Sequence, residues 1–392
     1  MNNEIKTKKI MFSGGGTGGS VTPLLAVAEK MLVEDTEPDK IKLELFFVGT
    51  ANGPEKGMVE ASNKKMAVDG FIALKFIPLS SGKFRRYFSL ANFFDIFKIS
   101  AAFFQSLILL TRERPAIVIS AGSFVSVPLV FAASLKKIPV LIHQQDIRPG
   151  LANKLMAPYA RAVTVTFENS LGDYGAKAVW TGNPINDLRK YQEMISETRA
   201  KYKLDSRKPL ILITGGGTGA AAINELVFKA ICHCEKRSDE AISMLTDFYQ
   251  IIHLTGKGKL PSSDQAASLK NSNYQVFEFL NNEELLSLMA VANLVISRCG
   301  IATLTELAAL SKPAILIPMP DTHQEDNAAV FSSAEAAVVL DQRELTPEKL
   351  VAEVKRILSD ATLKEKLQNN ISKVIKRGAT ENFLGIIWEM IK

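Results

Sequence analysis

The sequence predicts an α/β protein with two domains, each built on a doubly wound parallel sheet. One observation is that short apolar runs, typical of buried parallel strands, alternate with helical patterns along the chain. A second is a duplication: a strand, a glycine-rich turn and a helix occupy residues 9–28, and the same pattern returns at residues 210–229. The third is length, because 392 residues suffice for two or three domains of about 150 residues each. Together these observations favour two similar halves.

The individual elements follow from local patterns. The first half contains apolar segments expected to be strands at residues 9–13, 43–48, 117–120, 140–143 and 162–166. The second half contains equivalent segments at residues 210–214, 248–254, 274–277, 294–297 and 314–318. Helical patterns lie at residues 24–28, 221–229, 283–292, 302–310 and 347–359, and a short amphipathic helix is expected at residues 381–392.

Residues 116–135 contain no charged residue and are about long enough to span a bilayer. Gly122, Pro128 and several serines interrupt the stretch. A buried strand, a Gly-Ser turn and a buried helix explain it better than a membrane-spanning helix, so we expect a soluble or peripheral protein.

A turn sequence, Thr181–Pro184, follows the last predicted strand of the first half and marks the expected domain boundary. We therefore expect domains at residues 1–180 and 181–375. The segment 376–392 is expected to form a C-terminal helix that packs back towards the first domain.

Composition excludes several classes of protein. The chain is 47% hydrophobic and 22% charged, which are ordinary values for a globular protein. Its net charge of +6 is mild for this length, and a dedicated nucleic-acid binder would concentrate more positive charge, so we expect no nucleic-acid partner. Three cysteines make no disulfide framework, which indicates a reducing compartment, and the polar first ten residues lack the apolar core of a signal peptide.

The two glycine-rich turns, Gly14–Gly19 and Gly215–Gly219, predict phosphate binding. Such turns between a strand and a helix expose backbone N–H groups and the positive end of the helix dipole. One loop alone is weak evidence, but two imply two phosphate-bearing ligands or one ligand held across a cleft. No Gly-Lys-Ser/Thr follows either loop, which argues against a P-loop nucleotidase. A nicotinamide oxidoreductase ranks last, because Glu34 and Asp35 lie in a loop-like run where a ribose-binding acid would end a strand.

Metal binding is not indicated. No Asp-x-Asp pair is present to bridge a nucleotide diphosphate through a divalent cation, and Cys232-His233-Cys234 lacks a second ligand pair at zinc spacing. We expect neither a metal nor a cofactor, so helix dipoles and N–H groups would carry the phosphate charge.

Two further clusters leave alternatives open. Glu306 follows the third glycine turn, at Gly300; it either completes a capping box with Thr303 or accepts hydrogen bonds from the ribose hydroxyls of a nucleotide. The polar run His323–Asn327 follows a strand at the edge where α/β proteins bind ligands, but it also suits a solvated loop.

The segment 82–104 is aromatic and locally basic. Much of it is expected to be helix core, yet Lys83, Arg85 and Arg86 beside aromatic residues also suit an anionic membrane surface. We expect a mixture of the two roles.

Several of these segments, in this order, resemble the MurG family of N-acetylglucosamine transferases over nearly the whole chain, from Ile10 to about Thr380. The matching segments are Gly14–Gly19, Gly122–Pro128, His143–Gln145, Gly182–Pro184, Gly215–Ala220 with Asn224, Arg298–Glu306, and His323-Gln324 with Asn327-Ala328. The resemblance implies a GT-B fold, in which two Rossmann-like domains face a cleft. It also implies inverting, metal-independent transfer of GlcNAc from UDP-GlcNAc to a polyprenyl diphosphate-linked acceptor in peptidoglycan synthesis. The enzyme would be peripheral, at the anionic cytoplasmic face of the plasma membrane, with the acceptor on the first domain and UDP-GlcNAc on the second.

The resemblance also implies roles for individual residues. Thr17, Gly18 and Gly19 would lie near the donor sugar and the acceptor diphosphate. Gly217, Thr218 and Asn224 would belong to the donor diphosphate region, and the main chain of Leu280 would meet the uracil. The nucleotide diphosphate and ribose would contact Ile301, Ala302, Thr303, Leu304, Thr305 and Glu306. His323 and Gln324 would hold the donor sugar.

The chain departs from the family pattern on the acceptor side. Ser20 replaces a His proposed as general base, Phe124 replaces a Tyr, and Gln144 and Asp146 replace a Glu and an Asn. Asn186 replaces an Arg; we expect Asn186 and the nearby Arg189, as a substitute for that Arg, to bind substrate. We expect Ser20, His143 and Asp146 at the catalytic site, with Asp146 as the relocated base. The departures leave open a different lipid acceptor, or a catalytically weak UDP-sugar-binding protein.

Overall fold

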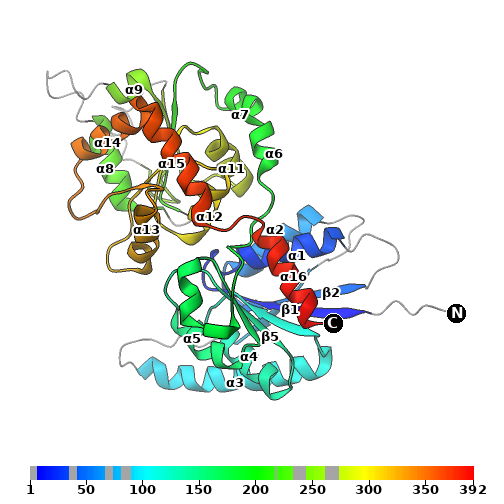
Figure 1. Cartoon of the computed structure of the whole chain (residues 1–392). Coiled ribbons are helices and arrows are strands. Elements are labelled where there is room, and N and C mark those ends of the chain that lie inside the picture. The colour runs from blue at the N-terminus through cyan, green and yellow to red at the C-terminus, as the bar shows by residue number, and fades with distance from the viewer. Residues whose placement is uncertain are drawn as a thin grey trace. The chain divides into compact units, whose positions relative to one another are not determined.

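The computed structural model describes residues 7–34, 42–66, 74–80, 90–216, 219–232, 244–260 and 273–392. The chain divides into two compact units (Figure 1). Unit 1 comprises Met1–Asn186 and Lys376–Lys392, and unit 2 comprises Asp187–Ile375. Each unit is an α/β sandwich around its own parallel sheet, which confirms the predicted fold class.

The sheet of unit 1 has the strand order β3-β2-β1-β4-β5-β6-β7, with every neighbouring pair parallel. Its strands are β1 (Lys8–Ser13), β2 (Leu43–Thr50), β3 (Leu74–Leu79), β4 (Ile117–Ser120), β5 (Val140–Gln144), β6 (Ala162–Val165) and β7 (Ala178–Trp180). Its α-helices are α1 (Thr22–Glu34), α2 (Glu55–Met66), α3 (Leu90–Glu113), α4 (Ser126–Leu135), α5 (Leu151–Met156) and α16 (Ala379–Met390). Short 3₁₀ helices cover Ala157–Tyr159, Glu168–Asp173 and Gly175–Lys177.

Both faces of this sheet are buried, because successive strand residues point to opposite sides. Met11 packs with the core beneath α3, α4 and α5, whereas Ile10 and Phe12 pack with α1 and α16. The C-terminal helix α16 therefore completes the second layer of unit 1, with Phe383 and Ile387 fully buried.

The sheet of unit 2 repeats the same order, β10-β9-β8-β11-β12-β13. Its strands are β8 (Leu210–Thr214), β9 (Gln250–Leu254), β10 (Tyr274–Phe277), β11 (Leu294–Ser297), β12 (Ala314–Leu316) and β13 (Val338–Val339). Its helices are α6 (Arg189–Glu193), α7 (Ile195–Lys201), α8 (Ala221–Cys232), α9 (Met244–Phe248), α11 (Asn282–Val291), α12 (Ile301–Ala309), α13 (His323–Ser333), α14 (Pro347–Ser359) and α15 (Ala361–Val374).

The strand order reverses direction between β1 and β4 in unit 1 and between β8 and β11 in unit 2. Doubly wound proteins bind ligands beyond the carboxyl ends of the strands at this switch point. The loops that follow β1, β4, β8 and β11 lie there, and they include the three glycine turns that the sequence singles out.

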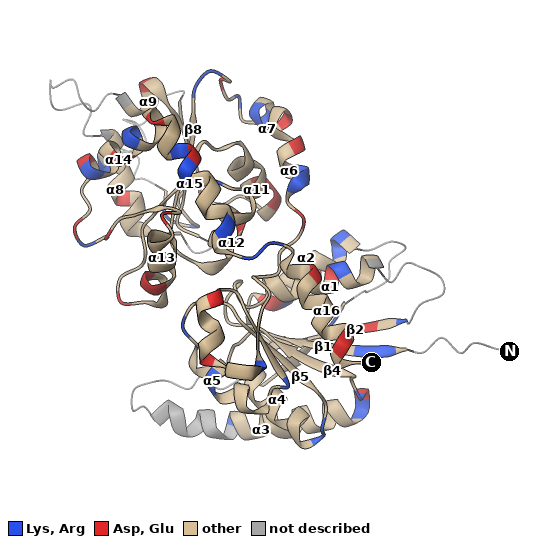
Figure 2. Cartoon of the chain, viewed as in Figure 1, with Lys and Arg blue, Asp and Glu red and all other residues tan. Residues whose placement is uncertain are grey.

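The structure shows where local patterns were insufficient. The uncharged stretch 116–135 forms β4, a turn and α4 as predicted, and no helix in the described ranges is long and apolar enough to cross a membrane. The short strands β3, β7 and β13 were missed. Charged residues gather on helices, loops and strand ends (Figure 2), which leaves the middle of each sheet apolar.

Candidate active site

The first glycine loop is closed by the side chain of Ser20. The Ser20 hydroxyl accepts a hydrogen bond from the Gly15 N–H (3.1 Å) and donates to the carbonyl oxygens of Gly15 (2.9 Å) and Thr17 (3.3 Å). Ser20 is only 8% exposed. The expected catalytic role of Ser20 therefore does not fit the structure, because its hydroxyl is turned inward and holds the loop together.

The other side of this loop is open. Gly16 and Thr17 are exposed, and Gly18 and Gly19 are half-buried. The loop then passes into α1, where the N–H and hydroxyl of Thr22 both donate to the Gly18 carbonyl. The carbonyls of Thr17, Gly18 and Gly19 are thus engaged within unit 1, and it is their main-chain N–H groups that have no acceptor among the described residues.

His143 lies inside the core of unit 1. Its side chain has no exposed surface, Nδ1 lies 3.0 Å from Thr164 Oγ1, and Nε2 lies 2.9 Å from Asn183 Oδ1. Phe383 packs edge-on against the ring. Burial lowers the pKa of His143 to about 4, so the ring is neutral at pH 7. Both nitrogens are engaged, which corrects the expected catalytic role: His143 links β5 to the Gly182–Pro184 turn.

The residues that follow His143 connect β5 to the first glycine loop. The Gln145 amide donates to the Gly19 carbonyl at 2.7 Å. Gln144 is buried, donates to the carbonyls of Asp146 and Arg148, and accepts from Asn153 and the Tyr174 hydroxyl. Asp146 is half-buried and comes directly after Gln145. Asp146 therefore follows directly on a residue whose side chain contacts the first glycine loop, and its catalytic role stays a prediction.

Asn186 and Arg189 lie on different units. The Asn186 amide donates to Glu29 on α1 at 2.8 Å, within unit 1. Arg189 begins α6 of unit 2 and forms a two-pronged ion pair with Asp187, with its side chain 84% exposed. The structure gives each of them a local partner on its own unit.

The second glycine loop is held by main-chain contacts and by two side chains, Thr214 and Lys259, of which the Lys259 ammonium donates to the Gly219 carbonyl at 3.2 Å. The Gly216 N–H donates to the Thr214 hydroxyl and the Gly219 N–H donates to the Gly216 carbonyl. Gly219 has φ +68°, and a Cβ there would collide with the Thr255 carbonyl, so only glycine fits. Gly217 and Thr218 lie outside the described residues.

Asn224 holds this region from within. Its amide donates to the Thr255 carbonyl at 2.9 Å, and its Oδ1 lies 3.1 Å from His253 Nε2. His253 Nδ1 in turn lies 2.9 Å from the Tyr274 hydroxyl. Asn224 is 3% exposed, which corrects the expectation that it contacts substrate. It fixes the turn after β9 instead.

Leu280 lies between β10 and α11. It is half-buried, and it precedes a capping box in which Asn281 and Glu284 each accept from the other's main-chain N–H. The neighbouring Phe279 is 57% exposed, and the Lys257 ammonium lies 5.0 Å from its ring centre. The main chain at Leu280 therefore has a defined position beside an exposed aromatic ring.

The helix α12 begins at Ile301, with Gly300 as its N-cap and no side-chain cap. The capping-box interpretation of Thr303 and Glu306 is therefore wrong, because Thr303 does not cap the helix. Ile301, Leu304 and Thr305 are buried, and Thr305 donates to the Ile301 carbonyl. Main-chain N–H groups and the half-buried Ala302 and Thr303 remain available to a ligand.

Glu306 is 8% exposed, and its carboxyl forms no hydrogen bond with any residue that the structure describes. Burial raises the pKa of Glu306 to about 7. A buried carboxyl without a hydrogen-bond partner lowers the stability of the fold. A ligand with hydroxyl donors would supply the missing hydrogen bonds.

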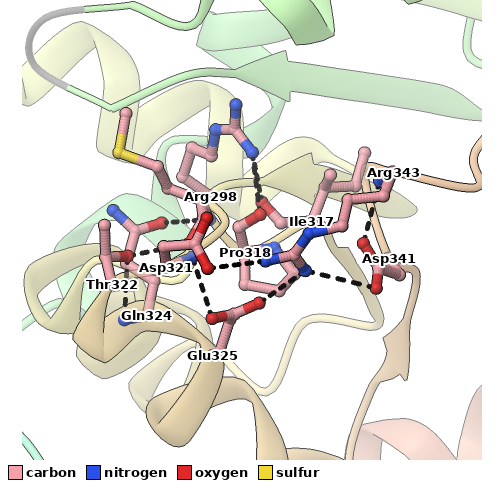
Figure 3. Close-up of polar contacts among 10 residues, drawn as sticks. Arg298, Ile317, Pro318, Asp321, Thr322, Gln324, Glu325, Asp341 and Arg343 are labelled. Atoms are coloured by element: carbon pink, nitrogen blue, oxygen red, sulfur yellow. Dashed lines mark hydrogen bonds and ion pairs between the residues drawn. The ribbon is translucent and has the colours of Figure 1, made fainter.

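A network of side chains fixes the loop between β12 and α13 (Figure 3). Arg298 is 7% exposed and donates to the carbonyls of Ile317 and Pro318, each at 3.0 Å, and to Gln342. Gln324 Oε1 accepts from the N–H groups of Cys299 (3.2 Å) and Met319 (3.1 Å). The Gln324 side chain therefore joins the loop after β11 to the loop after β12.

Arg343 holds the same loop from outside. Its guanidinium pairs with Asp321 (3.0 Å), Glu325 (2.9 Å) and Asp341 (3.4 Å). Asp321 has φ +58°, a conformation that needs support in a residue with a side chain. The run His323–Asn327 is the start of α13 and not a solvated loop; His323 is exposed, while Asn327 is buried and donates to the Cys299 carbonyl.

Sequence reasoning did not find Arg343, Gln342 or Asp321. They are separated along the chain from the glycine turns and belong to no motif, so only the fold brings them beside Gln324 and α13. Among the described residues no group of three or more His, Cys, Asp or Glu side chains is arranged to hold a metal ion, and His233 and Cys234 lie outside those residues.

Comparison with known proteins places this geometry in context. The glycosyltransferase family 28 N-terminal domain matches residues 10–165, and the family 28 C-terminal domain matches residues 210–382. A protein of Clostridium botulinum (strain Hall) is 37% identical over 386 residues, covering 94% of this chain and 99% of its own length. A protein of Clostridium kluyveri is 36% identical over 356 residues, covering 89% and 91%. Both carry the name UDP-N-acetylglucosamine–N-acetylmuramyl-(pentapeptide) pyrophosphoryl-undecaprenol N-acetylglucosamine transferase.

Solved structures share the fold. Acinetobacter baumannii MurG superposes with a TM-score of 0.68 at 23% identity, covering 97% of this chain and 99% of that one. The UDP-GlcNAc 2-epimerase of Neisseria meningitidis, bound to UDP-GlcNAc, superposes with a TM-score of 0.66 at 14% identity, covering 98% and 100%. At these identities the likeness is one of fold.

Proposed function

The chain belongs to glycosyltransferase family 28 and, within it, to the MurG family of N-acetylglucosamine transferases, and from this membership we propose its reaction. It transfers GlcNAc from UDP-GlcNAc to N-acetylmuramyl-(pentapeptide) pyrophosphoryl-undecaprenol (lipid I), which gives lipid II in peptidoglycan synthesis. The observation that carries the proposal is the 37% identity to a transferase of this name over almost the full length of both chains.

The donor site that we propose lies on unit 2. The buried Glu306 carboxyl accepts the ribose hydroxyls, the N–H groups at the start of α12 bind the diphosphate, and the Gln324 amide binds the sugar. The main chain at Leu280 meets the uracil. These assignments rest on the Glu306 carboxyl, which has no hydrogen-bond partner among the residues that the structure describes, on the absence of a side-chain cap at the N-terminus of α12, and on the two hydrogen bonds that fix Gln324.

The acceptor site that we propose lies on unit 1, at Thr17–Gly19 and Asp146. The acceptor hydroxyl attacks C1 of GlcNAc from the face opposite UDP, so that the C1–O bond to UDP breaks and the configuration at C1 inverts. Asp146 takes the hydroxyl proton, and N–H groups of α12 stabilise the charge that develops on the UDP diphosphate. Since the chain has no Asp-x-Asp pair, we propose that the transfer needs no metal.

We further propose that unit 1 contacts the cytoplasmic face of the plasma membrane. Phe104 and Ile108 on α3 and Leu135 at the end of α4 are each more than 60% exposed, and Lys136 and Lys137 follow Leu135. Exposed apolar residues beside cations suit an anionic lipid surface. Lys83, Arg85 and Arg86, the basic residues that the sequence singled out, lie outside the described residues.

The test is transfer of radiolabelled GlcNAc from UDP-GlcNAc to a short-chain lipid I analogue. We expect turnover that depends on both substrates. UDP-GlcNAc binding without turnover on any acceptor would contradict the proposal and indicate a UDP-sugar-binding protein.

A second candidate is a transferase for a different lipid acceptor. The departures at Ser20, Phe124, Gln144 and Asp146, all on the acceptor side, favour it. A panel containing the lipid I analogue, diacylglycerol and other polyprenyl diphosphate carriers separates the two functions, since each enzyme labels a different product.

A further inference from the structure

Glu55 is a buried carboxyl directly beside the first glycine loop. It is the first residue of α2, which follows β2 by a short turn. Strand β2 pairs with β1 in parallel, with Val48 opposite Ser13, so the turn after β2 and the loop after β1 leave the sheet at the same edge. The Glu55 side chain has no exposed surface.

Only one of the two oxygens of this carboxyl forms hydrogen bonds with described residues. Glu55 Oε1 accepts from the Thr50 N–H at 2.6 Å and from the Thr50 hydroxyl. Oε2 is buried and has no hydrogen-bond partner among the described residues. An acid in the first turn of a helix ordinarily stabilises the helix from the solvent side. Glu55 is turned inward instead, towards Thr50 and the first glycine loop.

The carboxyl is enclosed by glycines. A Cβ added to Gly15 would lie 2.5 Å from Glu55 Oε1, and all three of its nearest atoms would belong to Glu55. A Cβ on Gly49 would lie 2.6 Å from Glu55 Cγ, and one on Gly53 would collide with Oε2. The main chain therefore approaches this carboxyl from three sides more closely than any residue with a side chain allows.

Gly15 is thus held between two side chains. On one side Ser20 bonds to both its N–H and its carbonyl; on the other the Glu55 carboxyl lies against its Cα. The glycine loop has no side chain of its own between Gly14 and Gly16 to set its position. The position of the loop relative to the sheet edge therefore depends on the Ser20 and Glu55 side chains on either side of Gly15. This position in turn sets the direction of the main-chain groups at Thr17–Gly19.

We propose that Glu55 is a positioning residue for the acceptor: its carboxyl supports the Gly15 peptide and so sets the geometry with which the loop 14–20 meets the lipid-linked substrate. The proposal rests on the proposed function, which places the acceptor at this loop. Glu55 touches no substrate and acts through Gly15. A displacement of about 1 Å in such a loop is enough to lower the rate about 100-fold.

The first experiment compares Glu55→Gln, which keeps the shape of the side chain, with Glu55→Ala, which removes the support. We expect kcat/KM for the lipid I analogue to fall about 10- to 100-fold in Glu55→Ala and by a smaller factor in Glu55→Gln. The affinity for UDP-GlcNAc, measured by calorimetry on the same samples, should stay within about twofold, because the donor contacts lie on unit 2.

The matched control is Asn63→Ala on the same helix. Asn63 also makes two side-chain hydrogen bonds, both 2.9 Å, to the main chain of Leu74, but it does not touch the loop. It should lower the unfolding midpoint without changing acceptor kinetics. Wild-type kcat/KM for the acceptor in both Glu55 variants would overturn the proposal.

The second experiment is a double-mutant cycle. Gly15→Ala places a methyl group against the carboxyl, and combining it with Glu55→Ala removes the three atoms nearest to this methyl group. We expect the double variant to be no worse than Gly15→Ala alone, in unfolding midpoint and in acceptor kcat/KM. Losses that multiply would contradict the proposed contact.

The unfolding midpoints measured in this cycle also test the positioning role of Glu55 separately from the proposed function. If the wild-type protein transfers no GlcNAc, the proposed function fails, while coupling between Gly15 and Glu55 in the unfolding midpoint still reports whether the support exists. If the wild-type protein is active and Glu55 variants are unaffected, only the positioning role fails.

Discussion

The two units share a strand order but stabilise their glycine loops differently. In unit 1, side chains from three segments close on the loop: Ser20 from within it, Gln145 from the end of β5 and Glu55 from the start of α2. In unit 2, the described part of the loop is held by the Thr214 hydroxyl, by the Lys259 ammonium, which donates to the Gly219 carbonyl at 3.2 Å, and by main-chain contacts to Gly216 and Thr255. The rigid side-chain network of unit 2 lies elsewhere, around α12 and α13.

One sheet topology therefore supports two kinds of candidate site in this protein. Unit 1 builds its candidate site on the loop after β1, so the side chains beneath that loop decide its shape. Unit 2 builds its candidate site on the helices after β11 and β12, which Arg298, Gln324 and Arg343 join together. Loops and helix ends at the switch point vary while the sheet stays the same.

The largest effect is expected from Asp146→Asn in unit 1. Removing a positioned general base typically lowers the rate by about 10² to 10⁴. We expect kcat to fall in this range, with the affinity for UDP-GlcNAc unchanged, since the donor site lies on unit 2. Steady-state transfer assays with calorimetry measure both. Unchanged turnover would show that Asp146 is not the general base and would leave unit 1 without an assigned catalytic side chain.

Both units have a buried histidine on a strand beside the central pair of strands. His143 lies on β5, next to the pair β1 and β4, and His253 lies on β9, next to the pair β8 and β11. Burial lowers the pKa of His143 to about 4 and that of His253 to about 3. Because unfolding raises both towards 6.5, the unfolded chain binds more protons, and stability falls as pH drops below about 6.5.

Between pH 6.5 and pH 5, protonation linked to each histidine should lower the unfolding free energy of its unit by roughly 2 kcal/mol. Urea unfolding at pH 7 and pH 5 measures this loss, and His143→Gln should reduce it in unit 1 alone. Equal acid sensitivity of wild type and variant would show that His143 does not contribute to the loss.

A third prediction sharpens the role of unit 2. If the ionised Glu306 carboxyl accepts the ribose hydroxyls, UDP-GlcNAc affinity should fall about tenfold between pH 8 and pH 6, because the pKa near 7 makes the carboxyl take up a proton in this interval. Glu306→Gln should bind more weakly at pH 8 and show no such dependence. Calorimetry without acceptor provides the measurement, and a pH-dependent Glu306→Gln would assign the titration to another group.

The smallest effect is expected from Arg343→Gln. Its ion pairs are solvent-exposed, so their loss should change the unfolding free energy of unit 2 by about 1 kcal/mol or less. We expect the KM for UDP-GlcNAc to rise a few-fold, since the β12–α13 loop loses its outer support. Arg356→Gln, which breaks an exposed pair with Glu353 on α14, is the control. Equal effects of the two variants would show that Arg343 acts only as a surface charge.

Much of the architecture was predictable from local patterns. The apolar strands next to glycine turns marked β1, β8 and β11, because buried parallel strands are continuous apolar runs and the turns after them need residues without side chains. The sequence did not predict the short strands β3 and β7, because edge strands are short and have mixed polar and apolar sequences. Lys75 and Pro78 interrupt the apolar pattern of β3, and Val179 of β7 is exposed.

The candidate site was predictable only in outline. The resemblance pointed to Ser20, His143 and Asn224 by their place in motifs, but each turned out to bond within its own unit. Glu55 and Arg343 gave no signal at all. A motif identifies which residues lie near a site, but it does not say whether a side chain points towards the ligand or towards the scaffold.

The amino-acid sequence alone was enough to predict the duplicated α/β plan, the three glycine turns at strand ends and the family to which the chain belongs. These properties depend on periodicity and on the conformational range of glycine, which act over a few residues. The folded structure was needed to show which polar groups are internal supports, that the Glu55 carboxyl lies against Gly15, and that Arg298 and Arg343 both bind the loop between β12 and α13. Such contacts join residues far apart in the chain, and burial then sets their charge and partners.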